Sequence, residues 1–132
     1  MVSTIVQRGD YEQAFLGMKA QQVDAVFAGR GPVLFLARKP LIDLAAKYGL
    51  PAVWKARVMM EEGGLLSYGP HFADLYRRVA SFVDRIVKGA NPGDLPVEQP
   101  TKFELVINRK TATALGLSIP PSLLLRADQV VE

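Results

Sequence analysis

The sequence predicts an α/β fold, with a Rossmann-like parallel sheet flanked by helices, and two observations support that prediction. Apolar runs of strand length alternate along the chain with segments whose apolar residues recur at helical spacing. The strand-length runs are mostly continuous, which is typical of parallel strands that are buried on both faces. A chain of 132 residues has the length of one domain and can bury a core. We therefore expect a single α/β domain over residues 1–132.

The first part of the chain predicts a strand, a helix and a second strand. Residues 2–6 are β-branched and predict a strand, and Asp10 can cap a helix over residues 11–22. Residues 23–28 form a compact apolar run, which predicts a buried strand. This strand ends at the Gly and Pro residues of loop 29–32.

The middle of the chain continues the alternation with shorter elements. A helical apolar stripe ends at Tyr48, and Pro40 fits the first turn of a helix, so we place the helix start near Lys39. Gly49 follows the stripe as a helix-terminating glycine does. A strand, a helical turn and a second strand are expected next, over residues 51–54, 57–62 and 65–68.

The clearest helix covers residues 71–88. Its apolar residues share one face and are Phe72, Leu75, Tyr76, Val79, Phe82, Val83, Ile86 and Val87. A loop, a strand, two short helices and a terminal strand are expected after it, over residues 90–100, 103–108, 109–115, 120–126 and 128–131. Asn108 is placed to cap the first of these short helices.

The composition excludes several functional classes. The chain has no Cys, which excludes disulfides, iron–sulfur clusters and thiol catalysis, and a single His excludes a His-rich metal site. The net charge of +3 is spread over separated basic pairs, so we expect no nucleic-acid partner. No run of about 18 apolar residues occurs, so we expect no membrane insertion. Residues 1–10 lack the pattern of a signal peptide.

Catalytic patterns are missing as well. Loop 29–32 follows a strand and precedes a helix, but it lacks the glycine spacing of a nucleotide-binding loop. Ser67 lacks the Gly-x-Ser-x-Gly setting of a hydrolase nucleophile, and the one His, His71, fits a surface or capping role. We therefore expect neither enzymatic activity nor a cofactor or metal.

Two aromatic residues stand at the ends of short predicted strands. Trp54 and Tyr68 would ordinarily pack in a core. Ligands of α/β proteins bind outside the carboxyl ends of the strands, which favours a pocket wall for aromatic residues placed there.

The C-terminal half carries long and specific sequence patterns. Residues 63–69 read Gly-Gly-Leu-Leu-Ser-Tyr-Gly, and residues 95–108 read Leu-Pro-Val-Glu-Gln-Pro-Thr-Lys-Phe-Glu-Leu-Val-Ile-Asn. Lys-Thr-Ala at 110–112 and Ala-Leu-Gly-Leu at 114–117 follow. With these motifs the chain resembles the ABC-transporter substrate-binding family, whose better-known members resemble tryptophan-type amino-acid binding proteins. The resemblance covers nearly the whole chain.

The resemblance implies one lobe of a type I periplasmic binding protein. In that fold two Rossmann-like lobes close over a small ligand, and the closed form docks on an ABC permease. Family members are about twice as long, so the chain looks like a C-terminal lobe. Its residues 64–89 would form a strand and a crossing helix that pack on an N-terminal lobe. Without that lobe the apolar face of helix 71–88 would be exposed, so we expect a homodimer through this helix.

The resemblance also implies where a ligand would bind. The family's cleft would be lined by segments 29–32, 54–55 and 67–68. Arg30 could anchor a carboxylate, and Trp54 or Tyr68 could stack on an apolar side chain. The sequence departs from the family at Trp54, where Tyr is usual, and around residues 55–60. The predicted ligand-binding residues are Arg30, Pro32, Trp54, Ser67 and Tyr68.

The function that these observations favour is a solute-binding component of an ABC importer, or a fragment of one. It would bind a small amino-acid-like molecule without catalysis, and the resemblance implies a periplasmic location. One alternative is a dimeric ligand-sensing or interaction module that uses the same lobe. A second alternative is a small flavodoxin-like enzyme, against which the missing nucleotide loop counts.

Overall fold

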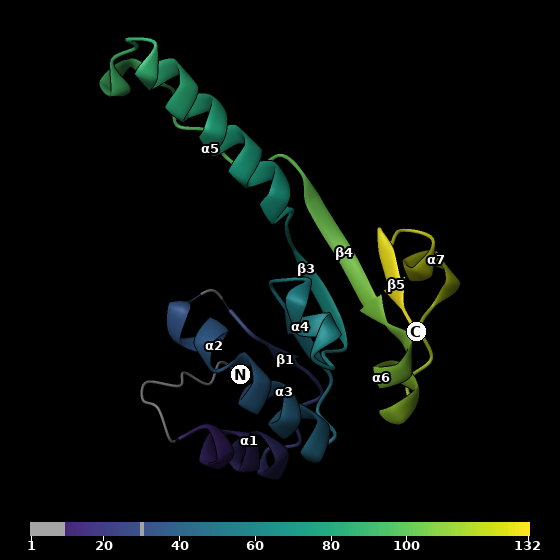
Figure 1. The fold of residues 1–132 in the computed structure, drawn as a ribbon. Helices are drawn as coiled ribbons and strands as arrows, with labels where there is room; N and C mark the ends of the chain where they lie inside the picture. The colour runs from purple at the N-terminus through teal and green to yellow at the C-terminus, as the bar shows by residue number, and fades with distance from the viewer. Residues whose placement is uncertain (1–9, 30) are drawn as a thin grey trace.

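The computed structural model describes residues 10–29 and 31–132 and shows a five-stranded sheet flanked by helices. In the first half the elements are α1 (Tyr11–Ala20), β1 (Val26–Phe27), α2 (Pro32–Leu36), α3 (Arg38–Lys47), β2 (Ala52–Trp54), α4 (Val58–Glu61) and β3 (Leu66–Pro70). They continue with α5 (Phe72–Val87), a 3-10 turn over Pro92–Asp94, β4 (Phe103–Asn108), α6 (Arg109–Ala114), α7 (Pro121–Leu124) and β5 (Gln129–Val131) (Figure 1). The α/β prediction is confirmed. The strand predicted over residues 2–6 lies outside the described residues.

The sheet is mixed rather than wholly parallel, which corrects one detail of the prediction. The strands lie in chain order from β1 to β5. The pairs β1–β2, β2–β3 and β4–β5 are parallel, whereas β3 and β4 are antiparallel. Each parallel pair is joined by at least one helix, as a parallel crossover requires. Between β3 and β4 the chain instead leaves the sheet and returns, so that β4 runs back along β3.

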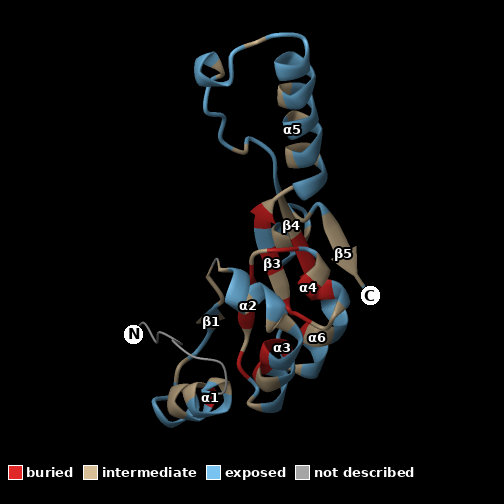
Figure 2. Ribbon diagram, turned by 60° about the vertical axis from the view of Figure 1, so that its left-hand side comes forward, coloured by how far each residue is buried: buried red, intermediate tan, exposed pale blue. Residues whose placement is uncertain are grey.

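The segment between β3 and β4 forms an arm, which we define as residues 71–102, and the other described residues form the body. The arm consists of α5 and the loop that returns from it, and it stands away from the body (Figure 1). None of the α5 residues is buried (Figure 2). Arg78 holds the returning loop by donating hydrogen bonds to Glu98 (3.4 Å) and to Thr101. The predicted helix over residues 71–88 is confirmed.

Other boundaries differ from the sequence expectations for local reasons. Only two residues of the run 23–28 pair with β2, which shortens the predicted strand to β1. The segment 33–48 contains two helices, because the helical backbone conformation is interrupted at Ala37, between α2 and α3. Gly49 has a φ of +62°, which confirms the predicted glycine end of α3.

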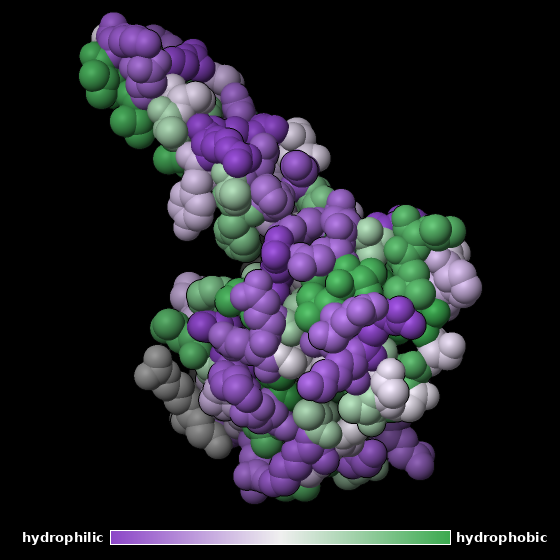
Figure 3. Space-filling view, turned by 45° about the vertical axis from the view of Figure 1, so that its right-hand side comes forward, coloured by the Kyte–Doolittle hydropathy of each residue, from purple (hydrophilic) through white to green (hydrophobic). Residues whose placement is uncertain are grey.

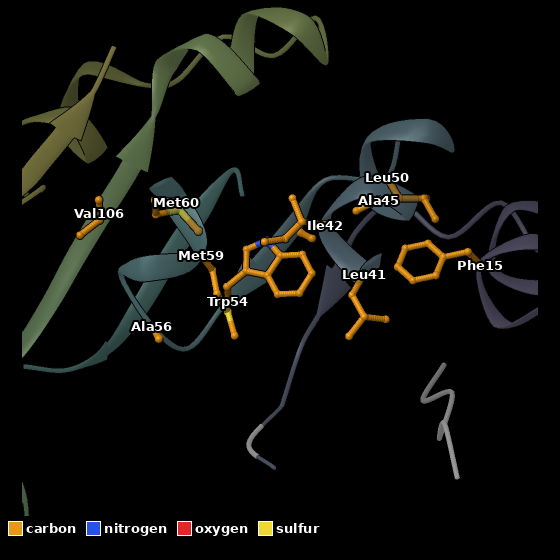
Figure 4. Close-up of a cluster of buried hydrophobic side chains, with 11 residues drawn as sticks. Phe15, Leu41, Ile42, Ala45, Leu50, Trp54, Ala56, Met59, Met60 and Val106 are labelled. Atoms are coloured by element: carbon orange, nitrogen blue, oxygen red, sulfur yellow. The ribbon is translucent and has the colours of Figure 1, made fainter. Parts of the chain in front are cut away.

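The core lies between the sheet and helices α1, α3 and α4. Buried side chains gather around Trp54, which lies beside Ile42 and Met59 (Figure 4). Phe15 of α1 stacks on Tyr48 with ring centroids 6.3 Å apart, which fastens α1 to the end of α3. Hydrogen bonds that the Lys47 ammonium and the Tyr48 hydroxyl donate to Glu12 reinforce this contact, and they lower the pKa of that carboxyl from its ordinary value.

Candidate functional site

A cavity of about 550 Å³ opens where the arm meets the body. It lies beyond the carboxyl ends of β2 and β3, where ligands of open α/β sheets bind. The body contributes side chains from α2, from the segment after β2 and from the start of β4, and the arm contributes its first residues. The lining residues are Phe35, Ala56, Arg57, Val58, Glu61, His71, Phe72, Ala73, Tyr76 and Glu104.

A close backbone approach at Gly69 shapes this cavity. A Cβ atom on Gly69 would lie 2.1 Å from the carbonyl oxygen of Lys55, far below any possible contact distance. The chain after β2 therefore passes directly over the end of β3, and Ala56 and Arg57 follow at the cavity wall. Glu104 lies opposite Gly69 in the register of β3 and β4, so its paired residue in β3 has no side chain. Glycine at position 69 thus lets three lining segments meet.

The cavity carries charges of both signs. Arg57 contacts Glu61 with 3.7 Å between Nε and Oε1, and both side chains are about half exposed. Glu104 is half-buried and has no ion-pair partner among residues 10–29 and 31–132. A surface pair such as Arg57–Glu61 contributes at most about 1 kcal/mol, so Arg57 can exchange its partner at small cost.

His71 serves as the N-cap of α5. Its Nδ1 atom accepts a hydrogen bond from the backbone N–H of Asp74 at 3.3 Å, so the capping role expected from the sequence is confirmed. This cap satisfies one of the backbone N–H groups that the first turn of α5 leaves without a partner. Phe72 and Tyr76 lie on the first turns and present aromatic surface at the cavity, with Tyr76 72% exposed.

The structure places the described members of the predicted ligand set outside this cavity, although it brings Trp54 and Ser67 together in the sheet. Arg30 lies outside the described residues, and Pro32 is the exposed first residue of α2. Trp54 and Ser67 are register partners whose side chains are 2% and 1% exposed, so neither presents a surface to a ligand. Tyr68 is half exposed and stacks on Phe103 with centroids 5.7 Å apart. None of the four described residues lines the cavity.

Several lining residues lie close in sequence to the predicted ones. Arg57 follows Trp54 by three positions, and His71 follows Tyr68 by three. The predicted residues and the cavity therefore lie at the same edge of the sheet, beyond the carboxyl ends of β2 and β3. The signal that could have identified the residues themselves is the set of charged and aromatic side chains that begins just after each strand, at Arg57 and Phe72.

The described residues include neither a group that could hold a metal ion nor a membrane-spanning helix. Within the part of the chain that the structure describes, no cluster of three or more His, Asp or Glu residues could hold a metal ion. Among the same residues, no helix combines the length and the apolar character that crossing a membrane requires.

Comparisons with known proteins find one matching family and several similar structures. The model of a family described as ABC transporter substrate binding protein matches residues 4–131. No curated protein matches the chain. A solved ABC domain from Streptococcus pneumonia in complex with L-Trp is 27% identical, with a TM-score of 0.89 over 99% of this chain. A conserved domain protein from Vibrio cholerae O1 biovar eltor is 26% identical, with a TM-score of 0.87 over 97%.

A third similar structure bears on the fold alone. It is the ligand-free, open form of a substrate-binding protein with adhesive properties from Clostridium difficile, 16% identical, with a TM-score of 0.64 over 98% of this chain. The chain spans 43% of the Vibrio protein, 44% of the Streptococcus protein and 43% of the Clostridium protein. It therefore corresponds to less than half the length of each.

Proposed function

Because the chain belongs to the ABC transporter substrate-binding protein family, we propose that it binds a small amino-acid-like solute for an ABC importer, without catalysis. The observation that carries this proposal is the cavity between the arm and the body. It combines aromatic walls with charges of both signs at the carboxyl edge of the strands. The complex of the similar Streptococcus domain with L-Trp supports an amino-acid ligand.

The proposed function implies a protein partner and a location in the cell. An ABC permease would receive the solute, and the protein would work in the periplasm. The body and the base of the arm supply one wall of the binding cleft. A second lobe that packs on the arm would supply the opposite wall of the cleft, as the resemblance to a C-terminal lobe implies.

Ligand binding is expected to raise the thermal stability of the purified chain. At about 100 times its Kd, a ligand adds about 2.7 kcal/mol to the free energy of unfolding, which corresponds to several degrees in Tm. Thermal unfolding with each of the common amino acids, followed by calorimetric titration of the hits, measures this effect. A folded protein whose Tm responds to none of them would contradict the proposal.

The exposed side of α5 favours association with a second copy of the chain. Its apolar residues follow the alternating four- and three-residue spacing of a coiled-coil seam and are Phe72, Tyr76, Val79, Val83 and Ile86. Figure 3 shows hydrophobic surface gathered along one side of the arm. A second copy carries the same stripe, so an antiparallel pairing would be self-complementary. Phe72 and Tyr76 belong both to this stripe and to the cavity lining, so a partner helix would cover them and form part of the cavity wall. That arrangement also suits a dimeric ligand-sensing module.

A charge on the seam is expected to break this dimer. Light scattering on a sizing column should give about twice the chain mass of 14.5 kDa for the wild type. Val83→Lys should give the mass of a monomer, because burying an unpaired ammonium in an apolar seam is costly. Ser81→Lys introduces the same charge on the other side of α5 and should remain dimeric. A monomeric wild type would contradict the proposed pairing.

A further inference from the structure

We propose that His71 is a pH-sensitive cap, whose imidazole leaves the start of α5 and turns toward Glu104 when it is protonated. This device belongs to the arm itself, and it would act whatever molecule the cavity binds. His71 is the one histidine of the sequence and lies where β3 ends and α5 begins. Histidine is the side chain that ordinarily changes charge between about pH 5 and 8, so a histidine cap can change state within that range.

The imidazole of His71 can cap α5 only while it is neutral. Its Nδ1 atom accepts the hydrogen bond from the Asp74 backbone N–H at 3.3 Å, so Nδ1 carries no proton and the neutral ring carries its proton on Nε2. Protonation adds a hydrogen to Nδ1, and two donors then face each other. The positive end of the helix also disfavours an imidazolium at the first turn. The ring of a protonated His71 must therefore leave the capping position.

The backbone retains part of the cap when the ring leaves. The Asp74 N–H also donates to the His71 carbonyl oxygen at 3.0 Å, so the imidazole supplies one branch of a three-centre hydrogen bond. The His71 backbone N–H donates to the Lys102 carbonyl oxygen at 3.0 Å, which joins the two ends of the arm without using a side chain. We therefore expect acid to loosen the first turn of α5 and not to unfold the arm.

Glu104 is the carboxylate toward which a protonated ring would turn. His71 continues β3 with an extended backbone, and Gly69, two residues before it, is the register partner of Glu104. Glu104 therefore lies diagonally across from His71 on the same face, and both residues line the cavity. Lys102 lies directly opposite His71, and its positive charge opposes protonation, whereas the charge of Glu104 favours it.

The other charged groups around His71 are paired with one another. On α5, Asp74 contacts Arg78 with 3.1 Å between Oδ2 and Nε. Across the cavity, Arg57 contacts Glu61 at 3.7 Å. Glu104 has no ion-pair partner within residues 10–29 and 31–132, so it is the acceptor that remains for an imidazolium.

NMR of the full chain between about pH 5.5 and 8 tests this device, because a single histidine gives one unambiguous set of ring signals. At the upper end of the range, the ring nitrogen shifts should show a neutral imidazole with its proton on Nε2. As the pH falls, the ring should become protonated. Hydrogen-exchange protection of the Asp74 N–H, corrected for the intrinsic pH dependence of exchange, should fall about two- to fivefold with the same midpoint.

Two controls separate the cap from a general effect of acid. Asparagine caps helices through an oxygen that does not titrate, so protection of Asp74 in His71→Asn should stay constant over the same range. In the wild type, the Thr111 N–H is capped by Asn108 Oδ1 at 3.0 Å and should also stay constant. Three results would each overturn the proposal: a ring that stays neutral throughout, an Asp74 amide that ignores protonation of the ring, or an equal loss of protection in His71→Asn.

Discussion

Gly69→Ala is expected to lower the free energy of unfolding by about 3 kcal/mol, at the upper end of the usual cost of overpacking. The added Cβ would lie 2.1 Å from the Lys55 carbonyl oxygen and 3.0 Å from its carbonyl carbon. Both are backbone atoms, so no side chain can rotate away. The chain after β2 would have to move off β3, which would also displace Arg57 and weaken ligand binding.

Denaturant unfolding followed by the fluorescence of Trp54 measures this loss. Trp54 is the single tryptophan of the chain and is buried in the core, so its emission reports on the body. Gly17→Ala is the matched control, because its Cβ would meet no atom within 4 Å in α1. Alanine forms helix better than glycine by up to about 1 kcal/mol, so Gly17→Ala should not lower the free energy of unfolding. Equal unfolding midpoints for Gly69→Ala and wild type would refute the steric argument.

Asn108→Ala is expected to lower the free energy of unfolding by about 2 kcal/mol, because one buried side chain joins three elements. The Asn108 Oδ1 atom accepts from the backbone N–H of Thr111 at 3.0 Å and caps α6. Its Nδ2 group donates to the carbonyl oxygen of Met60 in α4 at 3.1 Å. Loss of the cap accounts for about 1 kcal/mol. Loss of the second hydrogen bond adds about 1 kcal/mol and no more, because the Met60 carbonyl still accepts from the Gly63 N–H at 3.1 Å.

A second variant separates the two hydrogen bonds of Asn108. Asn108→Ser retains an oxygen that can cap α6 but removes the amide group that reaches Met60. Its free energy of unfolding should therefore lie between those of the wild type and of Asn108→Ala. Thr113→Ala is the control, because the Thr113 hydroxyl is exposed and bonds only the Arg109 carbonyl. It should change stability by less than about 0.5 kcal/mol. Serine and alanine variants of equal stability would show that the cap contributes nothing.

The sequence predicted most helices and strands because their ends carry distinctive residues. Asn108 caps α6 and Gly49 ends α3, as expected from their residue types. The antiparallel step between β3 and β4 was not predictable from apolar runs. A continuous apolar run indicates that a strand is buried. The direction of β4 depends instead on the arm, residues 71–102, which leaves the sheet after β3 and returns so that β4 pairs antiparallel with β3.

The candidate site was predictable as a region and not as a set of residues. Successive side chains of a strand point to opposite faces, so Ser67 is buried while Tyr68 stacks on Phe103 on the other side. Sequence position alone does not show which of two such neighbours faces a ligand. Similarly, the indole of Trp54 turns into the core, whereas Arg57 beyond the strand end faces the cavity.

The lengths of the outermost strands bear on how the chain avoids aggregation. Within the described residues, the sheet ends at β1 on one side and at β5 on the other, and these strands have two and three residues. A long, flat edge offers a row of unpaired backbone groups on which another chain can add a strand, and short edges offer few. The sheet is therefore a poor template for strand-by-strand polymerisation, so association through α5 would remain a contact between side chains.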